Sequence, residues 1–143
     1  DAKSIIPEED KTSYLLSSIM EEAISSSQME GANTTRRYAK EMLQKKSKPK
    51  NKSEQMIVNN YLTIKYITEN KYENISVEKL FCIHQLVTKD TLDKSEQGTF
   101  RNNNDIFIVN HSNSEVVHLP PNFEELDDLM QDFCIFFNRR IHL

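Results

Sequence analysis

The stretch SSQMEG, residues 26–31, contains the first residues whose types and spacing suggest chemistry. It falls at the expected end of an amphipathic helix, which places the carboxylate of Glu30 in the last turn. A negative charge there opposes the helix dipole, at a cost of roughly 0.3–1 kcal/mol. We expect a cation from elsewhere to offset that cost. An arginine fits best, because arginine–carboxylate pairs are often bidentate and geometrically specific.

Two neighbours of Glu30 favour the same interpretation. Ser26 lies four residues earlier, on the same helical face, and is expected to brace the helix end. Gly31 suits the position after the helix, where a positive φ is usually required. Taken alone, these residues leave an ordinary solvent-exposed glutamate near a helix end as the more frequent outcome.

Other chemistry finds little support in the residue pattern. The four histidines do not form an HExxH motif, and the two cysteines are too far apart in sequence for a paired-cysteine motif, so no metal site is predicted. His84 lies on an apolar helical face and is expected to be a core histidine with a satisfied hydrogen bond. Two glycines are too few for a Walker-type or Rossmann phosphate loop. Cys82 and Cys134 lie among apolar residues, which favours buried thiols and a cytoplasmic protein.

Size and composition set the outer limits. A chain of 143 residues fits one domain, and its two glycines and four prolines favour long helices. The net charge of −4 argues against nucleic acid as a partner of this chain. The basic run KKSKPKNKS, 45–53, is interpreted as a solvated loop. No apolar run could span a bilayer and no signal peptide is visible, so no membrane partner is expected.

The elements that must position these residues begin with helices. Helical periodicity predicts a helix over 10–30. A shorter helix follows, capped by Thr34 or Thr35 and ending near Lys46, with Tyr38 facing inward.

Two further helix starts are marked by capping residues. Asn51 and Glu54 have capping-box spacing, and the helix they open is predicted to run to about Asn70. Ser76 can cap a third major helix, whose apolar face includes His84.

The period changes after Gly98. The runs Asp105–Val109 and Glu115–Leu119 are β-prone and separated by turn residues, which predicts a β-hairpin. Pro120 and Pro121 end it, and Asn122 then opens a last helix through a capping box.

Two stretches resemble Fic-family proteins. Ser26–Gly31 resembles the inhibitory motif of that family, Ser/Thr-x-x-x-Glu-Gly/Asn. The segment Gly98-Thr99-Phe100-Arg101, followed by Ile106 and Ile108 and then Leu119-Pro120-Pro121, is similar to the G-x-[FY]-R segment and the β-hairpin "flap" that precede the Fic active site. Order and spacing match over roughly residues 18–137. The two motifs in this order are more specific than the first alone.

The resemblance implies a mainly α fold: the N-terminal part of a Fic-like helical domain with one β-hairpin flap. Residues 1–143 would then divide into an inhibitory helix region (10–46), core helices (54–97), the GxFR segment with the flap (98–121), and a further core helix (122–143).

The implied activity is AMPylation. Fic proteins mostly transfer AMP from ATP to a hydroxyl of a target protein, releasing pyrophosphate. Their signature, HPFxxGNGRxxR, supplies the base, the magnesium ligand, the phosphate loop and the critical arginine, and it is absent from these 143 residues. The chain is therefore expected to be a fragment of an autoinhibited adenylyltransferase. It would contain no catalytic residue, and ATP and Mg²⁺ would be cofactors of the full-length protein only.

Carried over residue by residue, Glu30 would be the inhibitory glutamate and would pair with the last arginine of the signature. Ser26 would brace the helix end, and Gly31 would let the chain turn away. The flap strand would consist of Ile106, Phe107, Ile108 and Val109, and its approach motif of Gly98, Phe100 and Arg101. In the family, this strand pairs with an extended segment of the target. Without the resemblance, an ordinary buried hairpin strand is the preferred interpretation.

The partners implied are a target protein with a Ser, Thr or Tyr hydroxyl and the remainder of the Fic domain. Whether Glu30 acts within one molecule or across a homodimer stays open. Two alternatives belong to other classes. One is a non-catalytic, antitoxin-like regulator that lends Glu30 to a partner enzyme, although such an inhibitor would need only the helix. The other is a helical interaction module without nucleotide chemistry.

Overall fold

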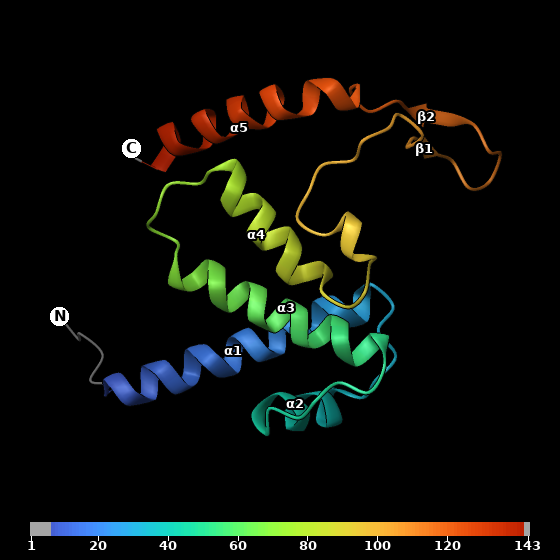
Figure 1. The fold of residues 1–143 in the computed structure, drawn as a ribbon. Coiled ribbons are helices and arrows are strands. Elements are labelled where there is room, and N and C mark those ends of the chain that lie inside the picture. Colours follow the sequence, from blue (N-terminus) through green and yellow to red (C-terminus); the bar gives the residue numbers. More distant parts are fainter. Residues whose placement is uncertain (1–6, 142–143) are drawn as a thin grey trace.

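The computed structural model describes residues 7–141, which form five α-helices and one two-stranded hairpin (Figure 1). The helices are α1 (Glu8–Met29), α2 (Arg36–Gln44), α3 (Lys52–Glu69), α4 (Val77–Thr88) and α5 (Leu126–Ile141), and the strands are β1 (Ile108–Val109) and β2 (Val116–His118). The predicted mainly helical class with one β-hairpin is confirmed. Residues 1–6 and 142–143 of the predicted regions lie outside the described residues.

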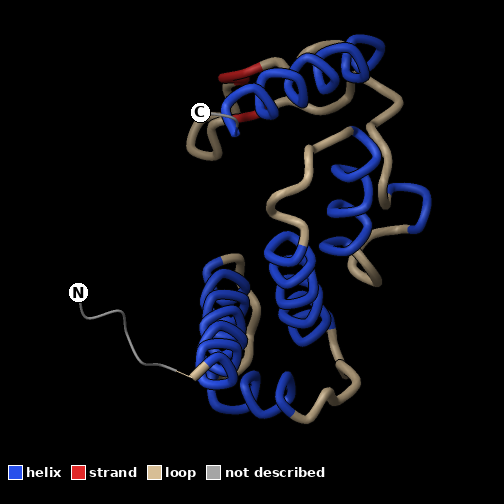
Figure 2. Tube along the Cα trace, turned by 90° about the vertical axis from the view of Figure 1, so that its left-hand side faces the viewer, coloured by secondary structure: helices blue, strands red, loops and turns tan. Residues whose placement is uncertain are grey.

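The helices form an open stack in which each layer packs on the next. α1 packs on α2 and α3, α3 packs on α4, and α4 packs on α5. Figure 1 shows α1 and α2 at one end of the stack and α5 with the hairpin at the other, and Figure 2 shows the same order after a quarter turn. The antiparallel hairpin pairs Ile108 with His118 and Val109 with Val116.

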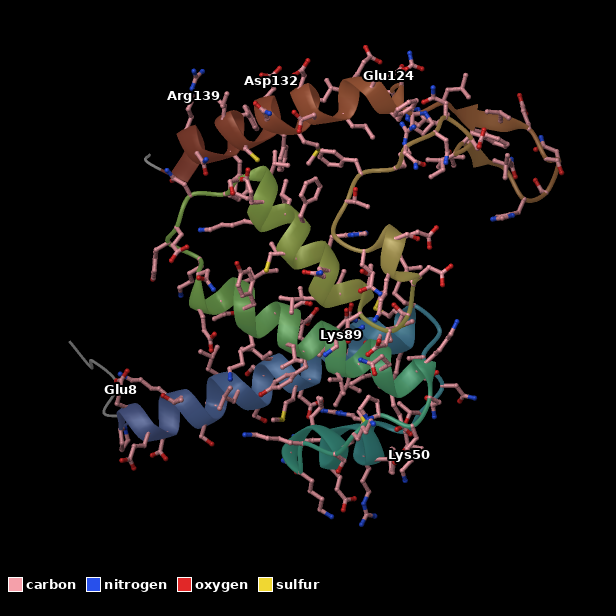
Figure 3. All side chains as sticks on the ribbon, in the orientation of Figure 1. Glu8, Lys50, Lys89, Glu124, Asp132 and Arg139 are labelled. Carbon is pink, nitrogen blue, oxygen red and sulfur yellow. The ribbon has the colours of Figure 1, made fainter. Side chains whose placement is uncertain are left out.

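The densest packing lies between the first three helices. One buried cluster joins α1, α2, α3 and the turn after α1, and it consists of Ile24, Ala32, Ala39, Met42, Leu43 and Ile57. α4 contains no buried residue, and in α5 Cys134 is buried. Figure 3 shows the polar side chains of Asp132 and Arg139 on the side of α5 that faces away from α4.

The predicted capping residues are confirmed, but Asn51 and Glu54 do not complete the predicted capping box, because the Glu54 carboxylate accepts from the Lys50 N–H instead. The side chains of Thr35, Asn51 and Ser76 each accept a hydrogen bond from the backbone N–H three residues later, at 3.3, 2.9 and 3.2 Å. Asn122 forms the predicted capping box, which opens a short 3₁₀ turn before α5. Local hydrogen bonding therefore sets where these helices begin.

Several predictions about side chains and lengths were wrong. Tyr38 is 41% exposed, because the face that α2 buries is centred on Ala39, Met42 and Leu43, and Tyr38 lies at the edge of that face. Each hairpin strand is shorter than its β-prone run, since the pairing register shifts between Ile108 and Val109. Both cysteines are free, but Cys82 is only half-buried.

An ion-pair cluster joins α1 to α2. The Glu21 carboxylate accepts hydrogen bonds from Arg36 Nε at 2.6 Å and from Lys40 Nζ at 2.7 Å. These two bonds, the one from Arg36 first, lower the pKa of Glu21 from 4.5 to about 2. The carboxylate therefore stays ionised in the folded state where it would be protonated in the unfolded chain.

We predict that Glu21 contributes to acid sensitivity. Its folded pKa is below its unfolded pKa, so its stabilisation is complete above about pH 4.5 and is lost as the pH falls towards 2. Glu21→Gln should therefore shrink the difference between the urea unfolding free energies measured at pH 7 and pH 3. Glu22→Gln, on an exposed neighbour, is the control. An undiminished difference in Glu21→Gln would contradict the prediction.

Candidate functional site

The C-terminal end of α1 is closed by a Schellman motif. The N–H of Ala32 donates to the carbonyl of Ser27 at 2.9 Å, and the N–H of Gly31 donates to the carbonyl of Gln28 at 3.0 Å. Gly31 has φ +93°, which confirms the positive φ predicted for it. Six-to-one and five-to-two bonds of this kind satisfy the last helix carbonyls and fix the direction in which the chain leaves. Glu30 occupies the cap position itself.

The side chain of Glu30 points away from the core of α1, α2 and α3. It is exposed, and within residues 7–141 its carboxylate has no hydrogen-bond or ion-pair partner. The preceding side chain, Met29, is 88% exposed. No arginine side chain in the described part pairs with Glu30; Arg36 binds Glu21 instead, and Arg101 binds groups at the base of the hairpin.

The serine hydroxyl that is fixed at this helix end is that of Ser27, whereas the bracing role of Ser26 stays a prediction. Ser26 meets Glu30 only through the backbone, where its carbonyl accepts from the Glu30 N–H at 3.1 Å. Ser27 is fully buried, and its hydroxyl donates to the Ala23 carbonyl at 2.7 Å. The same oxygen accepts from Asn60 Nδ2 of α3 at 2.8 Å. The sequence did hold a signal, because Ser27 falls on the apolar stripe of α1.

The GTFR segment is tied to α4. The N–H of Gly98 donates to His84 Nδ1 at 2.9 Å, which confirms the hydrogen bond predicted for this histidine. The side chain is half-buried, so its predicted place in the core was wrong. Gly98 has φ +66°, and a Cβ there would lie 3.2 Å from the carbonyl oxygen of Phe81. The ring of Phe100 meets that of Phe81 edge-on, with centroids 4.7 Å apart. Backbone shape and ring packing thus both hold this segment against one helix.

Arg101 fastens the base of the hairpin. Its guanidinium donates to the carbonyl of Asn103 at 2.6 Å, to Asn104 Oδ1 at 3.0 Å, and to the carbonyl of Pro121 on the far side of the hairpin. Asn104 Oδ1 also accepts from the N–H of Phe123 at 2.8 Å. Asn104 was not predicted from the sequence, because Phe123, its partner at the start of the last helix, lies 19 residues away.

The hairpin is an exposed element. The side chains of Ile106, Phe107 and Ile108 are between 51% and 55% exposed, and Val109 is half-buried. The alternative of a buried strand therefore does not hold. Of the four predicted flap residues, only Ile108 and Val109 lie in β1. The described sheet has two strands, so β1 keeps one edge without a strand partner.

The two predicted parts of the site do not meet. Among the described elements, α1 contacts neither α4, α5 nor the hairpin, and Figure 1 shows α3 and α4 between α1 and α5. Residues 7–141 contain no group of three His, Cys, Asp or Glu side chains that could hold a metal ion. In the same range, no helix has the length and apolar content needed to cross a membrane.

No protein-family model, curated protein or solved structure matches this chain.

The two glycines allow a matched test of how the site is held. Gly31→Ala should lower the free energy of unfolding by about 1–2 kcal/mol through its positive φ alone, since a Cβ there meets nothing within 4 Å. Gly98→Ala should cost more, because a Cβ would also crowd Phe81 and Gln85. Urea unfolding of both variants checks the order. A smaller loss for Gly98→Ala would contradict it.

Proposed function

We propose that this chain is part of an autoinhibited AMP-transferase of the Fic family. The observation that carries the proposal is Glu30, an exposed carboxylate without a partner among the described residues, on a helix end that hydrogen bonds hold in one direction. A free carboxylate against the helix dipole is unfavourable. A guanidinium outside the described residues would reverse that effect, and in the Fic family such an arginine orients the ATP γ-phosphate.

The inhibition is electrostatic and positional. Transfer from ATP depends chiefly on placing the phosphates and stabilising their charge. When Glu30 occupies the arginine, the γ-phosphate cannot sit productively, and transfer stops without any change in the catalytic residues. Met29, exposed beside Glu30, adds an apolar contact for the same neighbouring surface.

The hairpin is proposed as the target-binding flap. The open edge of β1 can accept an extended peptide by β-augmentation, in which main-chain hydrogen bonds supply affinity. Gly98, Phe100 and Arg101 hold the base of the hairpin, so its edge is presented from a fixed position. The acceptor would be a Ser, Thr or Tyr hydroxyl of the target.

ATP and Mg²⁺ are assigned to the complete protein and not to these residues. Residues 7–141 offer neither a metal-ligand group nor a glycine-rich phosphate loop. No chemical step is therefore assigned to a side chain of this chain. Its proposed contribution is to regulate the site through Glu30 and to position the target through the hairpin.

We predict that Glu30→Ala, in the protein that carries this chain together with the signature, raises AMP incorporation from labelled ATP. A charge-assisted pair contributes about 1.5–3 kcal/mol, so the increase should be about ten- to a hundred-fold. Glu22→Ala, which removes another exposed glutamate of α1, should leave incorporation unchanged. Unchanged labelling by a folded Glu30→Ala protein would overturn the proposed role, and a helical interaction module would then be the better interpretation.

We also predict that the 143-residue chain alone transfers no AMP and binds ATP–Mg²⁺ only weakly. Isothermal titration calorimetry should show no saturable heat at micromolar nucleotide. Micromolar binding would contradict the assignment of ATP to residues outside this chain.

A further inference from the structure

The end of α1 that carries Glu30 is joined to α3 by a polar contact between a buried serine and a half-buried asparagine. The Ser27 hydroxyl, fully buried, accepts a hydrogen bond from Asn60 Nδ2 at 2.8 Å. Two further bonds hold the turn that follows: the N–H of Asn33 donates to Ser53 Oγ at 3.0 Å, and Gln28 Nε2 donates to the Thr34 carbonyl at 2.9 Å.

Ser27 links both ends of this arrangement. Its carbonyl closes the Schellman motif by accepting from the Ala32 N–H, and its hydroxyl reaches Asn60. Glu30 lies three residues further on, inside the turn that this carbonyl closes. A shift of Ser27 relative to α3 would therefore carry Glu30 with it.

Burial alone does not require a serine here. The Ser27 hydroxyl already donates to the Ala23 carbonyl within its own helix. An alanine would fit the same apolar stripe and has the higher helix propensity. Fully satisfied buried polar contacts select one arrangement of the elements they join. The hydrogen bond from Asn60 therefore contributes to the position of α1 along α3, and not to the formation of helix α1.

We infer that Ser27 and Asn60 are positioning residues that set where Glu30 is held, and that the hydrogen bond between them tunes the inhibition. This inference rests on the proposed function. It adds residues that do not themselves touch nucleotide, arginine or target.

The first test measures position without any enzyme assay. Ser27→Ala and Asn60→Ala should each speed hydrogen exchange at the amides of Glu30, Gly31 and Ala32 by about two- to ten-fold, the range that one net hydrogen bond covers. Asn59→Ala is the matched control. The Asn59 amide lies on the same helix but donates to the carbonyls of Val87 and Lys89, at the end of α4. Asn59→Ala should therefore leave the exchange rates at Glu30, Gly31 and Ala32 unchanged, when these rates are compared with those of the slowest amides of the protein.

The second test measures inhibition in the protein that carries the signature. Asn60→Ala should raise AMP incorporation about two- to ten-fold. In a Glu30→Ala background it should raise it no further, because there is no carboxylate left to misplace. A merely destabilising change would instead lower incorporation in both backgrounds.

The outcomes separate the two ideas. Faster exchange at the three amides together with higher transfer supports the inference. If exchange in Ser27→Ala and Asn60→Ala is no faster than in the Asn59→Ala control, the inference is overturned, whether or not Glu30→Ala raises transfer. Faster exchange with unchanged transfer in Asn60→Ala, while Glu30→Ala still activates, overturns the tuning of inhibition. If Glu30→Ala also fails to activate, the proposed function itself is overturned.

Discussion

The interaction on which the N-terminal half depends is the packing of α1 on α3, completed by the hydrogen bond between Ser27 and Asn60. Ile24 and Ile57 bury their side chains fully in this interface, and the Schellman turn then fixes how the chain leaves α1. Burial supplies most of the free energy, while the hydrogen bonds decide the register. The consequence is that Glu30, although exposed, is carried by the best-packed part of the molecule. A carboxylate held in this way can meet a partner group without first losing much conformational freedom.

The C-terminal half is built differently. It is held by a few polar contacts between distant segments: Arg101 with the Pro121 carbonyl, and Asn138, whose amide pairs with both backbone groups of Ile75 at 2.9 Å. Much apolar surface stays exposed there, including Phe133 at 42% and Leu119 at 73%. Such surface is typical of faces that contact other protein. This contrast agrees with the division of roles proposed above, in which one half holds a carboxylate still and the other presents an edge.

How much of this could be predicted from the sequence follows from the range of the interactions. The capping serine, threonine and asparagine side chains, and the positive φ of Gly31, depend on neighbours within a few residues, so pattern alone found them. Asn60, which binds Ser27 from α3, is 33 residues away, and Phe123, which binds Asn104, is 19 residues away, so no local pattern could assign these two contacts. The predicted strand lengths were wrong for a related reason, since the β-prone runs extend further than the pairing between the two strands allows. The prediction that Tyr38 faces inward was wrong, because the short helix α2 buries only one narrow face and Tyr38 lies at its edge.

The most direct measurement is a crystal structure of the complete protein without nucleotide. The account predicts the Glu30 carboxylate within hydrogen-bond distance of an arginine guanidinium in the nucleotide site, with Ser27 still bonded to Asn60. A well-ordered Glu30 side chain surrounded by bulk water and remote from any such cleft would contradict it.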